Sequence, residues 1–162
     1  MIIHVKDKNT LIIDDFKFKC CIGKNGLSIS KKEGDYSTPK GIFNLKKLYF
    51  RRDRVGIPRC KIKKKIIKKN FAWCDDPKHK KYNEEIQVHT TNNRERLYRA
   101  DNIYDYIITI SHNHKKIPNK GSAIFIHLTN NYQPTAGCVA LKKKDFEILL
   151  KLIDKKTKIK IG

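Results

Sequence analysis

The sequence has no apolar run long enough to cross a bilayer, for which about 20 residues are needed. Acidic residues are scarce, because 16 Asp and Glu stand against 37 Lys and Arg, and the formal net charge is +21. The five cysteines include no Cys-x-x-Cys pair, which disfavours a structural zinc site, and their odd number leaves at least one thiol without an intramolecular partner. We therefore expect no transmembrane segment and no metal site.

A signal peptide is also missing from the start of the sequence. The apolar stretch within residues 1–7 is too short for one, and a strand pattern follows at once. The sequence leaves three possibilities open, namely a leader that has been lost, export by another route, and a cytoplasmic location.

The positive charge comes without a nucleic-acid recognition motif. Its densest run is residues 61–69, and no zinc-finger, RRM or helix-turn-helix signature accompanies it. A basic surface of this kind can attract any polyanion. We predict a solvated basic surface that can attract anionic envelope polymers, and no specific binding of nucleic acid.

Hydrophobic patterning predicts a mainly β fold. The length of 162 residues is enough for a real core and predicts a single domain over residues 1–162. Alternating or continuous apolar residues predict a hairpin over residues 3–13, further strands over 16–22, 104–110, 123–128 and 158–161, and a turn at Asn25-Gly26. Phe146, Leu149, Leu150 and Ile153 have helical spacing. Residues 51–70 and 75–102 have the least readable pattern. The fold expected is a β-sandwich with a few short helices, one of them near the C-terminus.

Residues 127–138, with the sequence His-Leu-Thr-Asn-Asn-Tyr-Gln-Pro-Thr-Ala-Gly-Cys, place a base and a thiol close together. His127 ends a buried apolar run, and Cys138 follows a Thr-Ala-Gly turn. A nearby imidazole can take a proton from a thiol or pair with a thiolate. The N–H groups of Ala136, Gly137 and Cys138 can converge on a developing oxyanion. The alternative is a buried structural cysteine beside a satisfied histidine.

This segment resembles the active-site motif of the L,D-transpeptidase catalytic domain family, whose members cross-link bacterial peptidoglycan. His127 matches the base, Thr135 the Ser/Thr, Gly137 the glycine and Cys138 the nucleophile. Ala136 stands where the family usually has a second His, and Leu128 and Ala140 also depart from the pattern. Further resemblance lies in the Thr-Pro-x-Gly-x-Phe segment within residues 33–43, and in residues 73–77, 82–83, 95–98 and 121–127.

The resemblance implies a cysteine transpeptidase that acts on peptidoglycan stem peptides in the cell envelope. Cys138 would form a thioester with His127 as base, the backbone around Ala136 and Gly137 would hold the oxyanion, and neither a metal nor an organic cofactor is implied. Substrate contacts are expected from Thr135, Trp73, Asp75 and Asp76, of which the last three also fit a core Trp and an Asp-Asp-Pro turn.

Two other functions remain open. One is a cysteine amidase or carboxypeptidase, in which water replaces the amine acceptor. The other is a basic polyanion-binding module with an inert cysteine. Reactivity separates the enzymes from the binding module, because an activated Cys138 is expected to have a depressed pKa and to react quickly with alkylating agents. The oligomeric state is not predicted.

Overall fold

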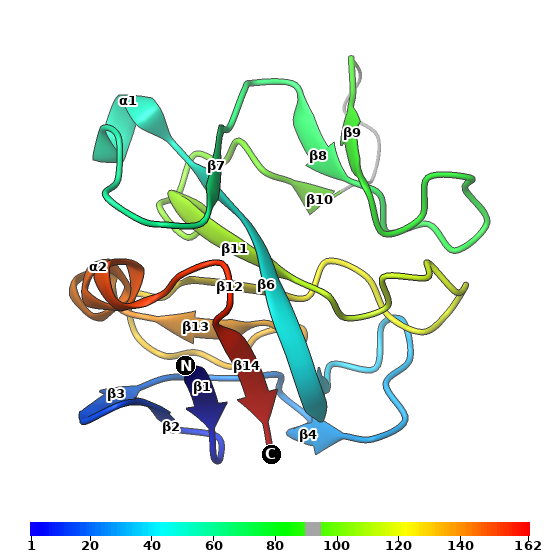
Figure 1. Cartoon of the computed structure of the whole chain (residues 1–162). Coiled ribbons are helices and arrows are strands. Elements are labelled where there is room, and N and C mark those ends of the chain that lie inside the picture. Colours follow the sequence, from blue (N-terminus) through cyan, green and yellow to red (C-terminus); the bar gives the residue numbers. More distant parts are fainter. Residues whose placement is uncertain (90–94) are drawn as a thin grey trace.

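The computed structural model describes residues 1–89 and 95–162 and consists mostly of strands (Figure 1). Strands hold 36% of the residues and helices 9%, which confirms the predicted mainly β fold class. The strands are β1 (Ile2–Val5), β2 (Thr10–Ile13), β3 (Phe16–Lys19), β4 (Leu27–Ser28), β5 (Thr38–Pro39), β6 (Gly41–Phe50), β7 (Lys63–Ile66), β8 (Phe71–Trp73), β9 (Glu85–Gln87), β10 (Glu95–Arg96), β11 (Tyr106–Ile110), β12 (Phe125–Leu128), β13 (Val139–Leu141) and β14 (Lys158–Ile161), and the helices are α1 (Arg52–Val55) and α2 (Lys143–Leu152).

One large sheet carries most of the strands. Its order is β13-β12-β11-β6-β14-β1-β2-β3, and β7 pairs with β6 beside this path. The long strand β6 runs through the middle, with β11 on one side and β14 on the other (Figure 1). Strand β14 pairs in parallel with β1, so the first and last strands of the described chain lie side by side inside the sheet.

The two edges of this sheet curl toward each other. Just after β3, Cys21 exchanges two backbone hydrogen bonds of 2.9 Å with Ala140 of β13. The sheet is therefore barrel-like. A smaller sheet of order β10-β8-β9 forms a second layer, and it lies on the β11 side of the large sheet in Figure 1.

The elements with the clearest periodicity lie where the sequence predicts them. Strands β1 and β2 form the predicted antiparallel hairpin, with His4 opposite Ile12, and β14 alternates between exposed lysines and buried isoleucines. Helix α2 buries Phe146, Leu149 and Leu150, as the helical spacing predicts.

Several predicted boundaries are wrong. The predicted strand 16–22 ends at Lys19, and the predicted strands 104–110 and 123–128 begin at Tyr106 and Phe125. The turn at Gly26 forms, but β4 then pairs in parallel with β5 and no hairpin with β3 results. Residues 51–70 contribute α1 and β7, and residues 75–102 contribute β9 and β10, with residues 90–94 lying outside the described part. No helix within the described ranges has the length and apolar composition needed to cross a membrane.

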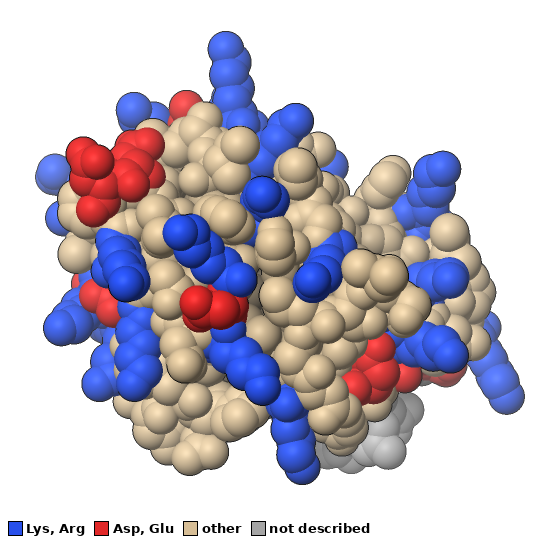
Figure 2. Space-filling view, turned by 90° about the horizontal axis from the view of Figure 1, so that it is seen from below, with Lys and Arg blue, Asp and Glu red and all other residues tan. Residues whose placement is uncertain are grey.

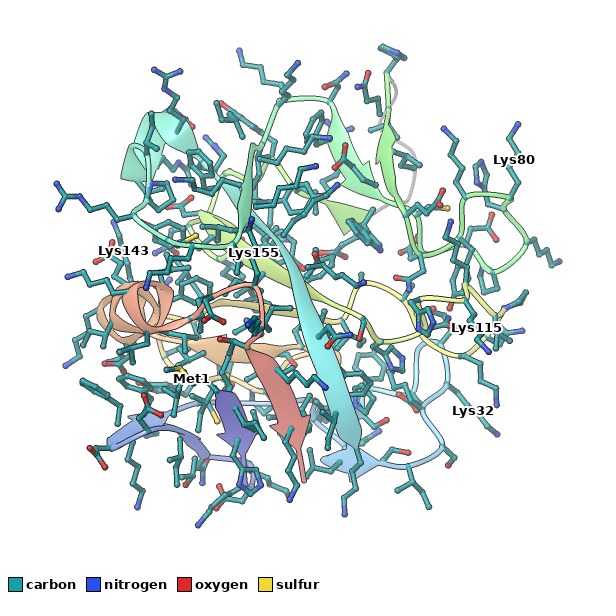
Figure 3. The ribbon with its side chains drawn as sticks, viewed as in Figure 1. Met1, Lys32, Lys80, Lys115, Lys143 and Lys155 are labelled. Atoms are coloured by element: carbon teal, nitrogen blue, oxygen red, sulfur yellow. The ribbon has the colours of Figure 1, made fainter. Side chains whose placement is uncertain are left out.

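The excess of basic side chains is spread over the surface. Figure 2, which looks from below Figure 1, shows lysines and arginines scattered across the whole face with smaller acidic groups between them. In Figure 3, Lys32, Lys80 and Lys115 lie at one side of the molecule and Lys143 at the opposite side. A spread of this kind attracts polyanions without a defined binding groove.

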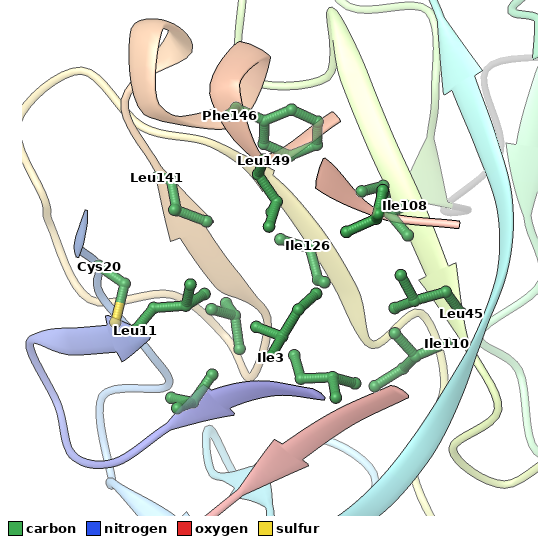
Figure 4. Packing of buried hydrophobic residues seen from close by; sticks show 14 of the residues in the cluster. Ile3, Leu11, Cys20, Leu45, Ile108, Ile110, Ile126, Leu141, Phe146 and Leu149 are labelled. Carbon is green, nitrogen blue, oxygen red and sulfur yellow. The ribbon is translucent and has the colours of Figure 1, made fainter. Parts of the chain in front are cut away.

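The core has two parts, one on each face of β11 and β12. The larger cluster fills the interior of the curled sheet beneath α2, where Ile3, Leu11, Ile126 and Leu141 meet (Figure 4). The smaller cluster contains Tyr49, Phe71, Leu97, Tyr104, Ile107, Phe125 and Cys138, and it lies between the large sheet and β8–β10. Since both faces of β11 are buried, its sequence is apolar almost throughout, as is typical of a central strand.

Candidate active site

Strands β12 and β13 bring His127 and Cys138 to the same face of the sheet. They pair in parallel with Ile126 beside Val139 and His127 beside Ala140, so that Cys138 continues the ladder next to Phe125. Side chains alternate along a strand, and therefore Phe125, His127 and Cys138 all face the smaller cluster. The offset between His127 and Cys138 is two residues along the strands, which corresponds to about 6.6 Å.

The sulfur of Cys138 has two backbone partners. Its thiol donates to the carbonyl of Ala123 over 3.1 Å, and the N–H of Phe125 donates to Sγ over 3.3 Å. Burial raises the pKa of Cys138 to about 12, and the Phe125 N–H opposes this rise only in part. The resting thiol is therefore protonated, which corrects the expectation of a depressed pKa. The physical reason is that a buried thiolate loses its hydration.

The ring of His127 is neutral and offers one lone pair. Its Nδ1 lies 2.8 Å from the carbonyl of Leu128. A carbonyl can only accept, so Nδ1 carries the proton and Nε2 is the unprotonated atom. Burial lowers the pKa of His127 to about 4, against the effect of the bond to Leu128. At neutral pH the pair is therefore a neutral imidazole and a neutral thiol.

Tyr104 covers this pair, and sequence reasoning missed its place in the site. Its ring packs edge-on against the ring of His127, with centroids 5.3 Å apart, and its hydroxyl donates to Glu95 over 2.6 Å. Burial, followed by the proximity of Cys138, raises the pKa of Tyr104 well above its usual value. In the sequence Tyr104 belongs only to a strand pattern, and no motif around it points to a site.

The turn before Cys138 is held by Thr135. The Thr135 hydroxyl accepts from the N–H of Gly137 over 3.1 Å and donates to the carbonyl of Cys138 over 2.6 Å. Gly137 has a φ of 146°, and a Cβ at this position would lie 2.8 Å from the carbonyl oxygen of Ser37. The turn thus fits against the 33–43 segment only because residue 137 has no side chain.

We expect Gly137→Ala to destabilise the fold and impair the site. The added methyl would overlap the Ser37 carbonyl, and overpacking of this kind costs about 1–3 kcal/mol. Urea unfolding followed by circular dichroism measures the loss. The control is Gly34→Ala, because Gly34 also has a positive φ, of 71°, but a Cβ added there would meet nothing within 4 Å. An equal loss of unfolding free energy in both variants would show that the close approach of residue 137 to the Ser37 carbonyl is not the cause.

The segments that carry the family resemblance meet at one cavity. Cys138 and His127 line it together with Thr135, Ala136 and Gly137, and its remaining wall comes from Lys31, Glu33, Gly34, Tyr36, Asp75, Glu95, Tyr104, Ser122, Ala123 and Ile124. Charged groups of both signs therefore surround the thiol, in contrast to the basic outer surface.

The other predicted substrate residues lie at different places. Asp75 lines the cavity of Cys138, whereas Trp73 lines a neighbouring cavity that shares Ile124 with it. Trp73 packs edge-on against Phe125, with ring centroids 5.2 Å apart. Asp76 accepts a hydrogen bond from the N–H of Lys78 in an exposed turn. Among the described residues, no group of three or more His, Cys, Asp or Glu side chains is placed to hold a metal ion.

Comparison with known proteins identifies a family for this chain. The family model YkuD, described as the L,D-transpeptidase catalytic domain, matches residues 2–161. No curated protein and no solved structure matches the chain. The family match spans the whole sheet, both helices and the cavity of Cys138.

Proposed function

Because this chain belongs to the L,D-transpeptidase catalytic domain family, whose members are acyltransferases that act on peptidoglycan peptides, we propose that it is a cysteine L,D-transpeptidase. Residues 1–162 would act as one catalytic domain. The observation that carries the proposal is the shared cavity of Cys138 and His127, in which Nε2 of the imidazole is unprotonated. This arrangement supplies a nucleophile and a base in one buried site.

The first half of the reaction forms a thioester. Sγ of Cys138 attacks the peptide carbonyl that precedes the terminal D-Ala of a stem peptide, while Nε2 of His127 takes the thiol proton. Since the resting pair is neutral, proton transfer accompanies the attack and no preformed ion pair is required. His127 then gives the proton to the departing D-Ala amine, and the acyl group stays on sulfur.

Backbone groups of the turn are proposed to stabilise the oxyanion. The N–H of Gly137 donates to the Thr135 hydroxyl in the resting state, so it must share or leave this bond to reach a developing negative charge. The exposed Ala136 supplies an N–H beside it. Donors of this kind stabilise the negative charge that develops in the transition state.

The second half transfers the acyl group to an acceptor. The amine of a neighbouring stem attacks the thioester carbonyl, His127 takes a proton from the amine and passes it to the sulfur, and the sulfur leaves as the thiol. Water in place of the amine gives a carboxypeptidase or an amidase. We propose that Asp75 contacts the stem from the cavity wall, and that Thr135, Trp73 and Asp76 contribute to its binding.

The basic surface and the family together support action in the cell envelope. Lysines spread over the faces in Figures 2 and 3 would draw the protein toward anionic envelope polymers by a long-range field that salt screens. Nucleic acid would bind only as another polyanion.

Product analysis tests the proposed reaction. A tetrapeptide stem that ends in D-Ala is incubated with the protein, with and without an amine acceptor, and the products are separated by liquid chromatography and mass spectrometry. We expect D-Ala release in both cases and a new amide only with the acceptor. Release without amide formation would support the carboxypeptidase, and no release at all would contradict both enzymes.

A further inference from the structure

Both backbone partners of the Cys138 sulfur lie in an unusual stretch of chain. Ala123, whose carbonyl accepts from the thiol, has a φ of 52°, which places a residue with a Cβ in the left-handed region. Two residues later, Phe125 donates its N–H to the same sulfur. Residues with a side chain hold such a conformation only where their surroundings impose it. Contacts from other segments must therefore hold Ala123 in place.

The side chain of Asn83 makes the contact that fixes Ala123. Its Oδ1 accepts from the N–H of Ala123 over 3.2 Å and from Nε1 of Trp73 over 2.9 Å. Its Nδ2 donates to the carbonyls of His112 and Asn113, over 3.2 Å and 3.1 Å. Oxygen and nitrogen thus each make two hydrogen bonds, which is the full capacity of an amide. Asn83 ties three separate segments together behind the thiol.

The second partner of the sulfur is linked to the same amide through Trp73. The indole donates to Asn83, and its ring packs edge-on against Phe125 with centroids 5.2 Å apart. Aromatic contacts of this geometry favour one orientation of the two rings. Movement of Asn83 would therefore disturb the backbone of Ala123 directly, and that of Phe125 only indirectly, through the ring of Trp73.

We infer that Asn83 is a positioning residue for the Cys138 sulfur. Its amide accepts from the N–H of Ala123, the residue whose carbonyl accepts from the thiol. Trp73, which donates to the same amide, packs against the ring of Phe125, the residue whose N–H donates to the sulfur. The inference deepens the proposed function and rests on it for the catalytic consequence. The effect of Asn83 on the protonation of the thiol is independent of the proposed function, because it can be measured without any substrate.

The two sulfur partners act in opposite directions on the proton. A carbonyl that accepts from S–H favours the neutral thiol, whereas an N–H that donates to sulfur favours the thiolate. By binding the Ala123 N–H, Asn83 fixes the backbone that carries the accepting carbonyl, and so favours the protonated thiol and one orientation of its S–H. Attack then depends on His127 and on a bound substrate.

The variant that tests this is Asn83→Gly. Asn83 has a φ of 57°, which glycine adopts without strain, so the change removes the amide and leaves the backbone conformation accessible. The matched control is Asn119→Gly, because Asn119 also has a positive φ of 63° and is exposed in the loop after β11. The readout is the rate at which iodoacetamide labels Cys138, followed peptide by peptide across a series of pH values.

We expect Asn83→Gly to lower the apparent pKa of Cys138 labelling by about one unit, which is the effect of losing one net hydrogen bond. Acyl transfer from the stem peptide should fall by about ten- to a hundredfold, since a misplaced nucleophile reacts slowly. Asn119→Gly should leave the apparent pKa of Cys138 labelling and the rate of acyl transfer unchanged. An unshifted labelling profile in Asn83→Gly, or an equal shift in the two variants, would overturn the inference.

A measurement on the unaltered protein covers the case in which Asn83→Gly does not fold. Hydrogen exchange at the Ala123 amide should be slow, because this N–H is bonded to Asn83. Exchange as fast as in an exposed loop would overturn the inference. If Asn83→Gly shifts the labelling profile but the unaltered protein transfers no acyl group, only the proposed function is refuted. If the unaltered protein transfers acyl groups but Asn83→Gly leaves the labelling profile unshifted, only the positioning role is refuted.

Discussion

Replacing Cys138 by alanine should remove acyl transfer almost entirely. Loss of a nucleophile that acts together with its base costs about four to six orders of magnitude in rate. Removing Sγ leaves no atom in the cavity that can carry the acyl group as a thioester. We expect no release of D-Ala above background and no acyl group bound to the protein. Chromatography of the products measures the release, and intact-mass spectrometry after an acid quench detects the acylated protein.

Cys60→Ala is the matched control for this experiment. Cys60 is a partly buried free thiol that donates to the carbonyl of Ile62 over 3.7 Å, and it lies before β7 rather than in the cavity. This variant should transfer at the rate of the unaltered protein and form the same adduct. Thermal unfolding checks that both variants fold. Transfer that survives Cys138→Ala would remove Cys138 from the role of nucleophile.

Replacing His127 by alanine should slow transfer by about a hundredfold to ten-thousandfold, which is the usual contribution of a positioned general base. The pH dependence should change as well. The pKa of His127 is lowered to about 4, so the base is available at any pH well above this value and activity should fall only as the pH approaches it. Without the base, reaction requires a thiolate formed beforehand.

The residual activity of His127→Ala therefore has a distinct signature. Because burial raises the pKa of Cys138 to about 12, the thiolate fraction grows about tenfold for each pH unit below that value. The logarithm of the residual rate should rise with pH at unit slope, while the unaltered protein shows a plateau through neutral pH. Initial rates over a pH series measure both profiles.

The control for the histidine is His114→Ala. His114 is exposed after β11 and lines the neighbouring cavity, so its removal should leave rate and plateau unchanged. A loss as large as that of His127→Ala would show that the base has been assigned to the wrong residue. The same result from His112→Ala would reassign the base to His112.

Local periodicity was enough to predict the elements with one buried face. The hairpin of β1 and β2, the alternating strand β14 and helix α2 each place apolar residues at the period of their own geometry. Alternation at residues 104–110 predicted strand β11, but clusters lie on both of its faces, so the pattern did not locate its first residue, Tyr106. The parallel pairing of β4 with β5, and the small sheet of β8 to β10, depend on contacts distant in sequence.

The sequence placed His127 and Cys138, the turn at residues 135–137 and Asp75 in the candidate site, and all of them line one cavity. His127 and Cys138 stand close together in sequence, and paired strands bring them to one face. Tyr104, Glu95 and Asn83 reach the site from separate segments, and hydrophobic patterning says nothing about which polar side chains meet. The depressed pKa expected for the thiol was wrong for a related reason, since burial is a property of the folded surroundings.

The position of β14 sets the order in which the molecule can be made. This strand lies between β6 and β1 in the large sheet, although it contains residues 158–161. During synthesis the hairpin of β1 and β2 leaves the ribosome early and must wait, because its partner in the sheet emerges only after the other strands. Non-local pairing of this kind slows folding and exposes strand edges. The sheet can be completed only after β14 has left the ribosome, so the edges of β1 and β6 that pair with it stay open until then.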